Sequence, residues 1–403
     1  MSARRGSTAP IRLAIVSTHP IQYNAPAFRE LAARAELNVK VFYEWEGPGK
    51  SIDHEFGRAI EWDVPLLDAY PYEFVPNVSS DPGTHHFRGI DNPSLVDRIR
   101  KWNPNVLLVY GWPFLSHLQV LRAFHGRIPV MFRGDSTLLD ERPGFRTGAR
   151  RVWLRWVYRQ VDVALYAGER NKDYFKAHGL RSTRLRWAPH AVDNERFAAD
   201  DGARNTEARA WRRSLDIEDE DVVFLFSGKL SPRKDPKILL SAFMGMHEFS
   251  SGIGAHLIFV GEGSLGASLR EAAGERPNVH FLGFQNQAIM PVVYRLADVT
   301  VLPSRSGETW GLSINESLAC GRPVIVSDRV GCAVDLVRRE STGLVFEHGS
   351  VTSLRGVMIC LLNDAGARTR MAREGVRIIR DWSVPVYAES VAAVVTEMAQ
   401  LHV

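Results

Sequence analysis

Residues 303–327 read PSRSGETWGLSINESLACGRPVIVS and contain two glutamates, Glu308 and Glu316, eight positions apart. Glu308 stands in a stretch rich in glycine and serine, which predicts a loop. Glu316 stands in a run that predicts a helix, and Gly321 and Pro323 end that run. The apolar residues that follow predict a short strand. One carboxylate is therefore expected on a loop and the other on a helix.

The spacing of the two carboxylates argues against a paired acid and base. Such a pair needs carboxyl groups about 5 to 9.5 Å apart, whereas eight helical residues rise about 12 Å. Each carboxylate can accept hydrogen bonds from a polyhydroxyl ligand, and the free amides at the start of the expected helix attract phosphate. We interpret Glu308 and Glu316 as contacts to one elongated ligand of sugar, phosphate and ribose. A solvated helix glutamate beside an unrelated loop glutamate is the alternative.

On both sides of this stretch, β-rich runs alternate with helical stretches through all 403 residues. This alternation is typical of parallel sheets built from βαβ units. The chain is too long for one hydrophobic core, which predicts two domains. Strands are expected at residues 11–16, 38–43, 72–75, 105–110, 128–132, 161–166 and 184–189, and then at 221–227, 256–260, 278–283, 298–303, 323–327 and 343–346.

The predicted fold class is α/β, with two Rossmann-like domains that face each other across a cleft. A polar segment without a strand pattern separates the two sets of strands and places the domain boundary near residue 192. The expected divisions are a flexible tail (1–10), a first domain (11–192), a second domain (193–383) and a helix (384–403) that packs back on the first domain.

Segments that follow the expected strands hold much of the glycine, histidine, tryptophan, arginine and lysine. Ligands of open parallel sheets bind outside the carboxyl ends of the strands, so these segments are expected to line the cleft. Lys229 and Lys234 follow the strand at 221–227 and are candidates to hold a diphosphate as point charges. Ordinary surface lysines are the alternative.

The loop after the first strand contributes candidate cleft residues from the first domain. Asn24 and Pro26 predict the start of a helix, with Asn24 as its cap. His19, Gln22 and Tyr23 are then expected to point into the cleft. For His19, a purely structural role is an equal alternative, because the sequence shows no catalytic partner for it.

Two short motifs have little functional meaning by themselves. Residues 133–135 read Arg-Gly-Asp, a coincidental match to an integrin-binding tripeptide, although Arg133 and Asp135 can reach the cleft from a strand end. Residues 261–266 match the glycine pattern of dinucleotide-binding proteins, but the next strand ends near Gln285 instead of an acidic residue. We therefore expect a tight, closely packed turn at 261–266.

Composition excludes several classes of protein. The net charge of +4 is small for this length and does not imply a nucleic-acid partner. The apolar runs are too short to span a bilayer. Three widely spaced cysteines are typical of reduced, buried thiols in the cytoplasm. We expect no metal, because no Asp-x-Asp loop follows a strand and the adjacent His85 and His86 lack metal-ligand spacing.

A basic, aromatic helix is expected near residues 146–162. Arg151, Arg155 and Arg159 form a stripe at four-residue intervals, and Trp153 and Trp156 lie nearby. Such a helix can rest on anionic lipid, which would place the protein at the inner membrane face. A solvated face of a helix packed on its own sheet is the alternative.

From about residue 222 to residue 346, the chain resembles the family-4 retaining glycosyltransferases, whose fold is called GT-B. The segments SGKLSPRKD, LIFVGEG, VHFLGF, GETWGLSINESLACGRP and TGLVF occur in the family's order, and the Glu-x7-Glu element followed by Ala-Cys-Gly-x-Pro is specific. The first half matches more weakly, through PHAVDNERF. The resemblance implies transfer of a hexose from a nucleoside-diphosphate sugar to a hydroxyl of a glycan or lipid-linked acceptor. It also implies retention of configuration, with no metal or other cofactor.

The resemblance further implies a role for each matching residue. Glu308 would bind the donor sugar, and Glu316 would bind the ribose hydroxyls. Lys229 and Lys234 would hold the diphosphate and, with Glu308, lie closest to the chemistry. The donor-binding residues would also include Gly228 and the backbone amides of Trp310, Gly311 and Leu312.

Two departures from the family concern the first domain. The loop after the first strand lacks the usual glycine pair, and Arg133 stands where many members have a histidine. Arg133 or His19 would then take over that role. A GT-B phosphorylase, a nucleotide-sugar epimerase and a non-catalytic glycan-binding protein remain as alternatives. The acceptor side is assigned to His19, Gln22, Tyr23, Asn24, Arg133 and Asp135.

Overall fold

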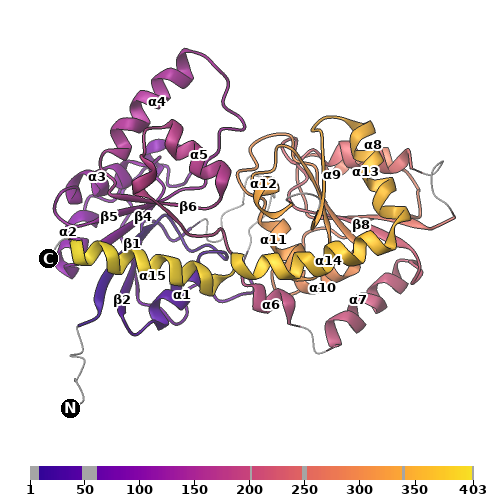
Figure 1. Ribbon diagram of the computed structural model, residues 1–403, viewed down its shortest axis with the longest axis horizontal. Helices are drawn as coiled ribbons and strands as arrows, with labels where there is room; N and C mark the ends of the chain where they lie inside the picture. The colour runs from indigo at the N-terminus through magenta and orange to yellow at the C-terminus, as the bar shows by residue number, and fades with distance from the viewer. Residues whose placement is uncertain (1–8, 48–60, 200–201, 247–251, 338–340, 402–403) are drawn as a thin grey trace.

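The computed structural model describes residues 9–47, 61–199, 202–246, 252–337 and 341–401. Most of the expected tail at 1–10 lies outside the described residues. The described chain forms two domains, each with a central parallel sheet between layers of helices (Figure 1). Each of the thirteen predicted strands is present at its predicted place.

The first domain is built on a seven-stranded parallel sheet with the strand order β3-β2-β1-β4-β5-β6-β7. Its strands are β1 (Ile11–Ser17), β2 (Leu37–Tyr43), β3 (Tyr72–Phe74), β4 (Val106–Tyr110), β5 (Val130–Arg133), β6 (Val163–Tyr166) and β7 (Leu185–Trp187). Its helices are α1 (Ala25–Ala33), α2 (Leu95–Trp102), α3 (Leu115–Phe124), α4 (Phe145–Tyr158) and α5 (Glu169–Ala177).

The second domain is built on a six-stranded parallel sheet with the order β10-β9-β8-β11-β12-β13. Its strands are β8 (Val222–Ser227), β9 (Ala255–Val260), β10 (Val279–Phe281), β11 (Val299–Leu302), β12 (Val324–Ser327) and β13 (Gly343–Phe346). Its helices are α6 (Asn194–Ala198), α7 (Ala203–Ser214), α8 (Pro236–Met244), α9 (Gly266–Ala273), α10 (Met290–Leu296), α11 (Leu312–Ala319), α12 (Ala333–Leu336), α13 (Val351–Asn363) and α14 (Ala365–Ile379).

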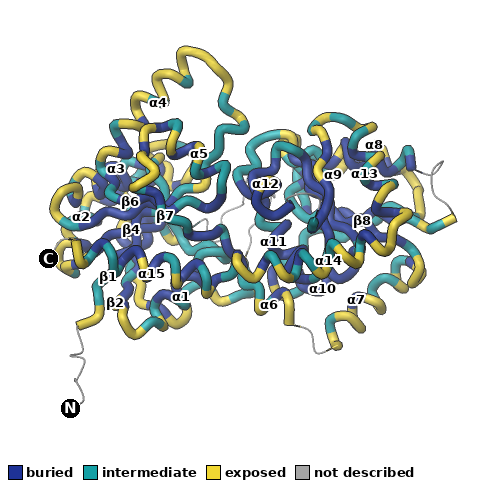
Figure 2. Tube along the Cα trace, viewed as in Figure 1, coloured by how far each residue is buried: buried dark blue, intermediate teal, exposed yellow. Residues whose placement is uncertain are grey.

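Both sheets are buried on both faces, which explains why their strands are nearly continuous apolar runs. In β8, Val223 and Leu225 belong to the core on one face of the sheet. Phe224 and Phe226 belong to the core on the other face, as the two-residue period of a strand requires. Figure 2 shows this burial along the strands and the exposure of much of α4.

The chain crosses between the domains at two adjacent places. Val192 and Ser383 pair in an isolated parallel bridge, so the outgoing and returning segments lie side by side. After this bridge, α15 (Val384–Leu401) runs across the first domain and packs along α1 (Figure 1). Val391 and Val395 are fully buried in the first-domain core. The predicted return of the last helix is therefore confirmed.

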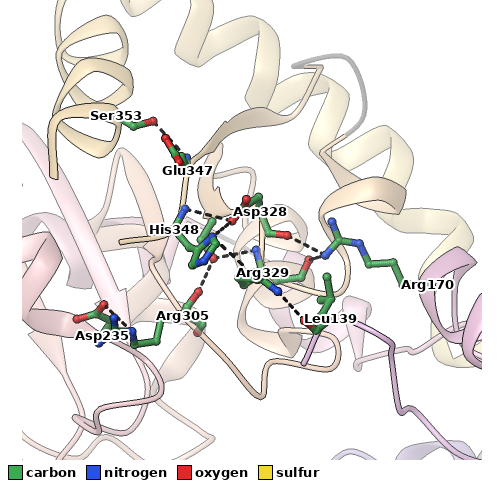
Figure 3. Close-up of polar contacts among 12 residues, drawn as sticks. Leu139, Arg170, Asp235, Arg305, Asp328, Arg329, Glu347, His348 and Ser353 are labelled. Carbon is green, nitrogen blue, oxygen red and sulfur yellow. Dashed lines mark hydrogen bonds and ion pairs between the residues drawn. The ribbon is translucent and has the colours of Figure 1, made fainter. Parts of the chain in front are cut away.

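A polar network holds the carboxyl end of β12 against the first domain (Figure 3). Arg170, on α5, donates hydrogen bonds to the carbonyl oxygens of Asp328 (3.0 Å) and Val330 (3.1 Å). Arg329 donates to the carbonyl oxygen of Leu139. These contacts join the loop after β12 to α5 and to the loop after β5.

The surface changes one sequence expectation. Cys320 and Cys332 are buried, but Cys360 is exposed on α13, so the prediction that all three thiols are buried was wrong. All three are free thiols. None of the described helices is both long enough and apolar enough to cross a bilayer.

Candidate active site

Two cavities lie where the carboxyl ends of the two sheets face each other. The larger cleft cavity has a volume of about 460 Å³ and is lined from both domains. It brings together every second-domain residue that the sequence predicted for the site: Gly228, Lys229, Lys234, Glu308, Trp310, Gly311, Leu312 and Glu316. A separate cavity of about 720 Å³, between α1, α6 and the start of α15, contains none of these residues.

Glu316 is buried on α11, and each of its carboxylate oxygens accepts a hydrogen bond from a hydroxyl group. Tyr294 donates to Oε2 (2.6 Å), and Tyr23 of the first domain donates to Oε1 (3.1 Å). Burial raises the pKa of Glu316 to about 6, although the two tyrosines and the charge of Arg196 oppose the shift. The carboxylate is thus placed to accept hydrogen bonds from hydroxyl groups at a buried position.

Glu308 lies in the loop after β11, as predicted, and has basic and hydroxyl partners. Its Oε2 atom forms an ion pair with Lys234 and accepts a hydrogen bond from Ser304 (2.9 Å). The sequence assigned Lys234 and Glu308 to neighbouring parts of one ligand, and the structure shows that the two side chains touch. A ligand that bridges them must therefore have its anionic and hydroxyl groups close together.

The turn that begins α11 depends on glycine. Gly311 has φ +100°, and a Cβ atom there would lie 2.8 Å from Leu302. A side chain at position 311 would therefore be both strained and crowded. Trp310 is held in place by a hydrogen bond from Nε1 to Asn315 (2.8 Å). Asn315 in turn donates to the carbonyl oxygen of His190 (2.9 Å), which links α11 to the first domain.

The glycines at 261–266 are packing residues. A Cβ atom at Gly261 would lie 2.0 Å from the carbonyl oxygen of Gly228, and one at Gly263 would lie 2.6 Å from that of Leu230. The two loops after β8 and β9 can approach this closely only because both positions are glycine. The expected tight turn is therefore present, and it positions Gly228 and Lys229.

The smaller cleft cavity has a volume of about 340 Å³ and belongs mainly to the first domain. Tyr23, Asn24, Arg133 and Asp135 line it, while Gln22 lines the larger cavity. Helix α1 begins at Ala25 as expected, but the side chain of Asn24 makes no capping hydrogen bond. Asn24 is therefore at the N-cap position, as predicted, but its side chain does not cap the helix.

His19 lines neither cleft cavity, so the prediction that it points into the cleft was wrong. Its ring packs edge-on against Trp45, with 5.5 Å between the ring centroids. Burial lowers the pKa of His19 to about 4. The structural alternative is therefore the better description of His19.

Arg133 lines the smaller cavity, but its guanidinium group is engaged by protein groups. It donates to the carbonyl oxygens of Ala188 and Pro189 and lies 5.1 Å from the ring centroid of Tyr387 on α15. Arg133 therefore fixes the loop after β7 against the returning helix.

His190 is the main site residue that sequence reasoning missed. It follows β7, lines both cleft cavities, and its Nε2 atom lies 4.0 Å from Asp135 Oδ2. Burial lowers its pKa to about 4, and the charge of Arg133 acts in the same direction while Asp135 opposes it. The ring is therefore neutral at neutral pH. The segment PHAVDN at a strand end was a signal for it, whereas nothing in the sequence indicated Tyr294.

One group of metal-ligand residue types occurs among the described residues. Asp81, His85 and His86 have possible ligand atoms within 4.8 Å of one another. The sequence analysis considered only the two histidines and did not predict that Asp81 lies beside them. Asp81 and His85 are exposed, His86 is partly so, and none of the three lines either cleft cavity.

The chain matches the family Glycosyl transferases group 1 over residues 207–377. It is 31% identical to the phosphatidyl-myo-inositol mannosyltransferase of Mycobacterium leprae over 302 residues, which cover 73% of this chain and 75% of that protein. It is 29% identical to the D-inositol 3-phosphate glycosyltransferase of Salinispora tropica, where the match covers 55% of this chain but only 49% of the relative. The match to the corresponding Salinispora arenicola protein likewise spans about half of it, 55%.

Solved structures share the fold at low sequence identity. Anabaena HepE in complex with UDP superimposes with a TM-score of 0.72 at 18% identity, covering 96% of this chain and 100% of HepE. Sucrose-phosphate synthase from Thermosynechococcus elongatus gives a TM-score of 0.70 at 16% identity, covering 96% and 98% of the two chains. The predicted GT-B architecture of two Rossmann-like domains is thus confirmed. Together with the sequence match to the mannosyltransferase, these features show that the chain belongs to the group 1 glycosyl transferases.

Proposed function

We propose that this protein transfers a hexose from a nucleoside-diphosphate sugar to an acceptor hydroxyl, with retention of configuration. One observation carries the proposal: the two cleft cavities meet at four shared residues. These are Tyr23, Asp135, His190 and Leu312. A donor in the larger cavity would present its sugar at this junction to an acceptor in the smaller cavity.

The donor roles follow from the side chains of the larger cavity. Glu316 would accept the ribose hydroxyls in exchange for the hydroxyl of Tyr23. Lys229 and Lys234 would hold the diphosphate, near the amides at the start of α11. Glu308, beside Lys234, would accept hydroxyls of the sugar. The ligand's sequence of ribose, diphosphate and sugar would then match the order of these groups.

The proposed chemical step needs no covalent enzyme intermediate. The bond between the anomeric carbon and the diphosphate oxygen breaks while the acceptor oxygen bonds to the same face of the sugar. The acceptor proton passes to the leaving phosphate oxygen. The protein contributes position and charge: the lysines stabilise the leaving diphosphate, and neutral His190 lies at the junction of the cavities.

We propose that the two lysines and the start of α11 neutralise the leaving group without a bound metal ion. Transfer should then continue in EDTA at an undiminished rate. Loss of transfer in EDTA, followed by recovery with magnesium, would reject this part of the proposal.

The names of the relatives indicate which donors to test first. The Mycobacterium leprae relative is named a mannosyltransferase, and the HepE structures contain UDP, in one case as UDP-glucose. We therefore propose a screen of glucose and mannose activated by different nucleoside diphosphates, with the uridine diphosphate sugars first. Transfer is detected by mass spectrometry of the acceptor, and the product's anomeric configuration is read by NMR. Inversion would reject retention. Release of a sugar phosphate in a phosphate-dependent reaction would indicate a phosphorylase.

We also propose that the acceptor is a glycan or lipid-linked glycan met at the cytoplasmic face of a membrane. Helix α4 exposes Phe145 (91%), Val152 (68%) and Trp153 (43%) beside the predicted arginine stripe. Within that stripe, Arg151 is paired with Glu141 (3.1 Å). Exposed apolar and basic groups on one helix suit an anionic lipid surface. Anionic vesicles should retain the protein at low salt and release it at high salt; equal recovery with neutral vesicles would reject the contact.

A further inference from the structure

Another cavity, of about 370 Å³, lies at the end of the second sheet that faces away from the cleft. It is lined by Asn205, Arg209 and Arg212 of α7, by Asp219, by Arg295 of α10 and by Arg322. We call it the arginine pocket. Asp219 precedes β8 and Arg322 precedes β12, so the pocket lies at the amino ends of the strands. The larger cleft cavity lies at their carboxyl ends, about 20 Å away by the length of a six-residue strand.

The lining of the arginine pocket has four guanidinium groups and one carboxylate, that of Asp219. Arg212 donates to Asp298 (2.8 Å) and to the carbonyl oxygen of Asp221 (2.9 Å). Arg295 is buried and donates to the carbonyl oxygen of Pro291 (2.8 Å). The residues that line the pocket therefore carry an excess of positive charge.

Two of these arginines contribute positive charge that no described carboxylate neutralises in an ion pair. Arg209 and Arg322 form no ion pair with a residue that the structure describes. The Nε atoms of Arg212 and Arg322 are buried and have no acceptor within the described protein. Burial lowers the pKa of Arg322, Asp298 opposes the shift, and the charges of Arg295 and Arg212 reinforce it. Buried N–H donors of this kind are normally satisfied by an acceptor.

We propose that the arginine pocket binds a phosphate-bearing anion at a site separate from the cleft. A phosphate offers several acceptor oxygens, and the planar guanidinium fork bonds two of them at once. The oxygens would bond guanidinium N–H groups of Arg212 and Arg322, which line the pocket, while Arg209 at the exposed rim attracts the anion. The volume is enough for a phosphate monoester of a small molecule. Two sources share this chemistry: inorganic phosphate and a phosphorylated metabolite.

The test measures anion binding to the full chain by calorimetry at low ionic strength. The probes are inorganic phosphate and glycerol phosphate. Arg322→Gln and Arg209→Gln should each weaken binding by roughly tenfold to a hundredfold, because a hydrogen-bonded charge is lost. Arg213→Gln is the matched control, since Arg213 is an exposed arginine of the same helix outside the pocket. Arg209 is also exposed, so its variant reports on binding without disturbing the core.

The Lys229→Ala variant distinguishes binding in the arginine pocket from binding in the cleft, because Lys229 lines only the larger cleft cavity. This variant should still bind phosphate if the anion occupies the arginine pocket. Binding that is lost in Lys229→Ala and unchanged in Arg209→Gln and Arg322→Gln would place the anion in the cleft and overturn the proposal. Tighter binding of glycerol phosphate than of phosphate supports a metabolite as the occupant. Equal binding supports the free anion. No binding of either probe by the unaltered chain would also overturn the proposal.

Discussion

Glu308 and Glu316 have different neighbours, and this difference separates their expected roles. Glu316 accepts two tyrosine hydroxyls in a buried place, whereas Glu308 is paired with Lys234 in a loop. A paired acid and base would share one reacting bond. Two carboxylates with such different partners are better suited to different groups of one ligand.

The two glutamine variants should therefore differ in kind. Glu316→Gln should weaken binding of both the bare nucleotide and the full donor. Glu308→Gln should spare nucleotide binding and lower turnover. A hydrogen bond to a charged group contributes about 1.5 to 3 kcal/mol, so the affinity or the turnover should fall roughly tenfold to a hundredfold. Calorimetry with the nucleotide and turnover with the donor measure both effects. Equal loss of turnover with intact nucleotide binding would instead indicate an acid/base pair.

The raised pKa of Glu316 predicts a pH dependence of donor binding. Its folded pKa of about 6 lies above the ordinary value of 4.5, so in this window the folded protein holds a proton that the unfolded chain has lost. Stability from this group therefore falls as the pH rises from 4.5 to 6. Ribose binding needs the carboxylate, so nucleotide affinity should rise over the same window.

Nucleotide affinity measured between pH 5 and pH 8 tests this dependence. The control is Glu316→Gln, which keeps the titration of the nucleotide's own phosphate and removes that of the carboxylate. The wild-type affinity should fall more steeply below pH 6 than that of the variant. Parallel profiles would mean that Glu316 does not titrate in contact with the ligand.

At the scale of elements, the start of α11 is the most constrained turn of the site. Gly311→Ala should lower stability and donor affinity together, because a side chain at φ +100° is strained and would meet Leu302 at 2.8 Å. The expected destabilisation is about 1 to 3 kcal/mol. Gly356→Ala is the matched control: Gly356 is exposed in α13 with nothing within 4 Å of a new Cβ atom. That change should stabilise the helix by about 1 kcal/mol. Urea denaturation of both variants decides, and equal effects would contradict the assigned strain.

The positions of the strands were predictable because buried parallel strands have a strong local signature. The second-domain site was predictable for a related reason: Lys229, Lys234, Glu308 and Glu316 all follow or flank such strands. Contacts between distant segments were not. His19 and His190 both follow strands of the first sheet, but His190 lines both cleft cavities, whereas His19 lines neither and packs against Trp45. The partners of Arg133 likewise lie more than fifty residues away in the sequence.

At the scale of the whole molecule, the contacts of α5 help to set how the domains face each other. Arg170→Ala removes two hydrogen bonds between the domains (Figure 3). The free energy that holds the two domains together should fall by about 1 to 3 kcal/mol. The free protein should show a larger radius of gyration by small-angle scattering and slower transfer. Nucleotide affinity should change little, because Arg170 lines neither cleft cavity.

Arg181→Ala provides the control for this prediction, since Arg181 is an exposed arginine of the same domain. It should leave the scattering profile unchanged. If Arg170→Ala has the scattering profile of Arg181→Ala, then the α5 contacts do not hold the domains together, and the other interdomain bonds suffice.

The bridge between Val192 and Ser383 has a consequence for how the protein is made. The second domain enters and leaves the chain at neighbouring points, so it is topologically an insertion into the first. The described strands and helices of the second domain all precede α15 in the chain, so its core does not wait for that helix. The core of the first domain does wait, because Val391 and Val395 belong to it and are made after the second domain. During synthesis, the first domain must therefore wait until α15 has left the ribosome, and the side of α1 that packs against α15 stays uncovered until then.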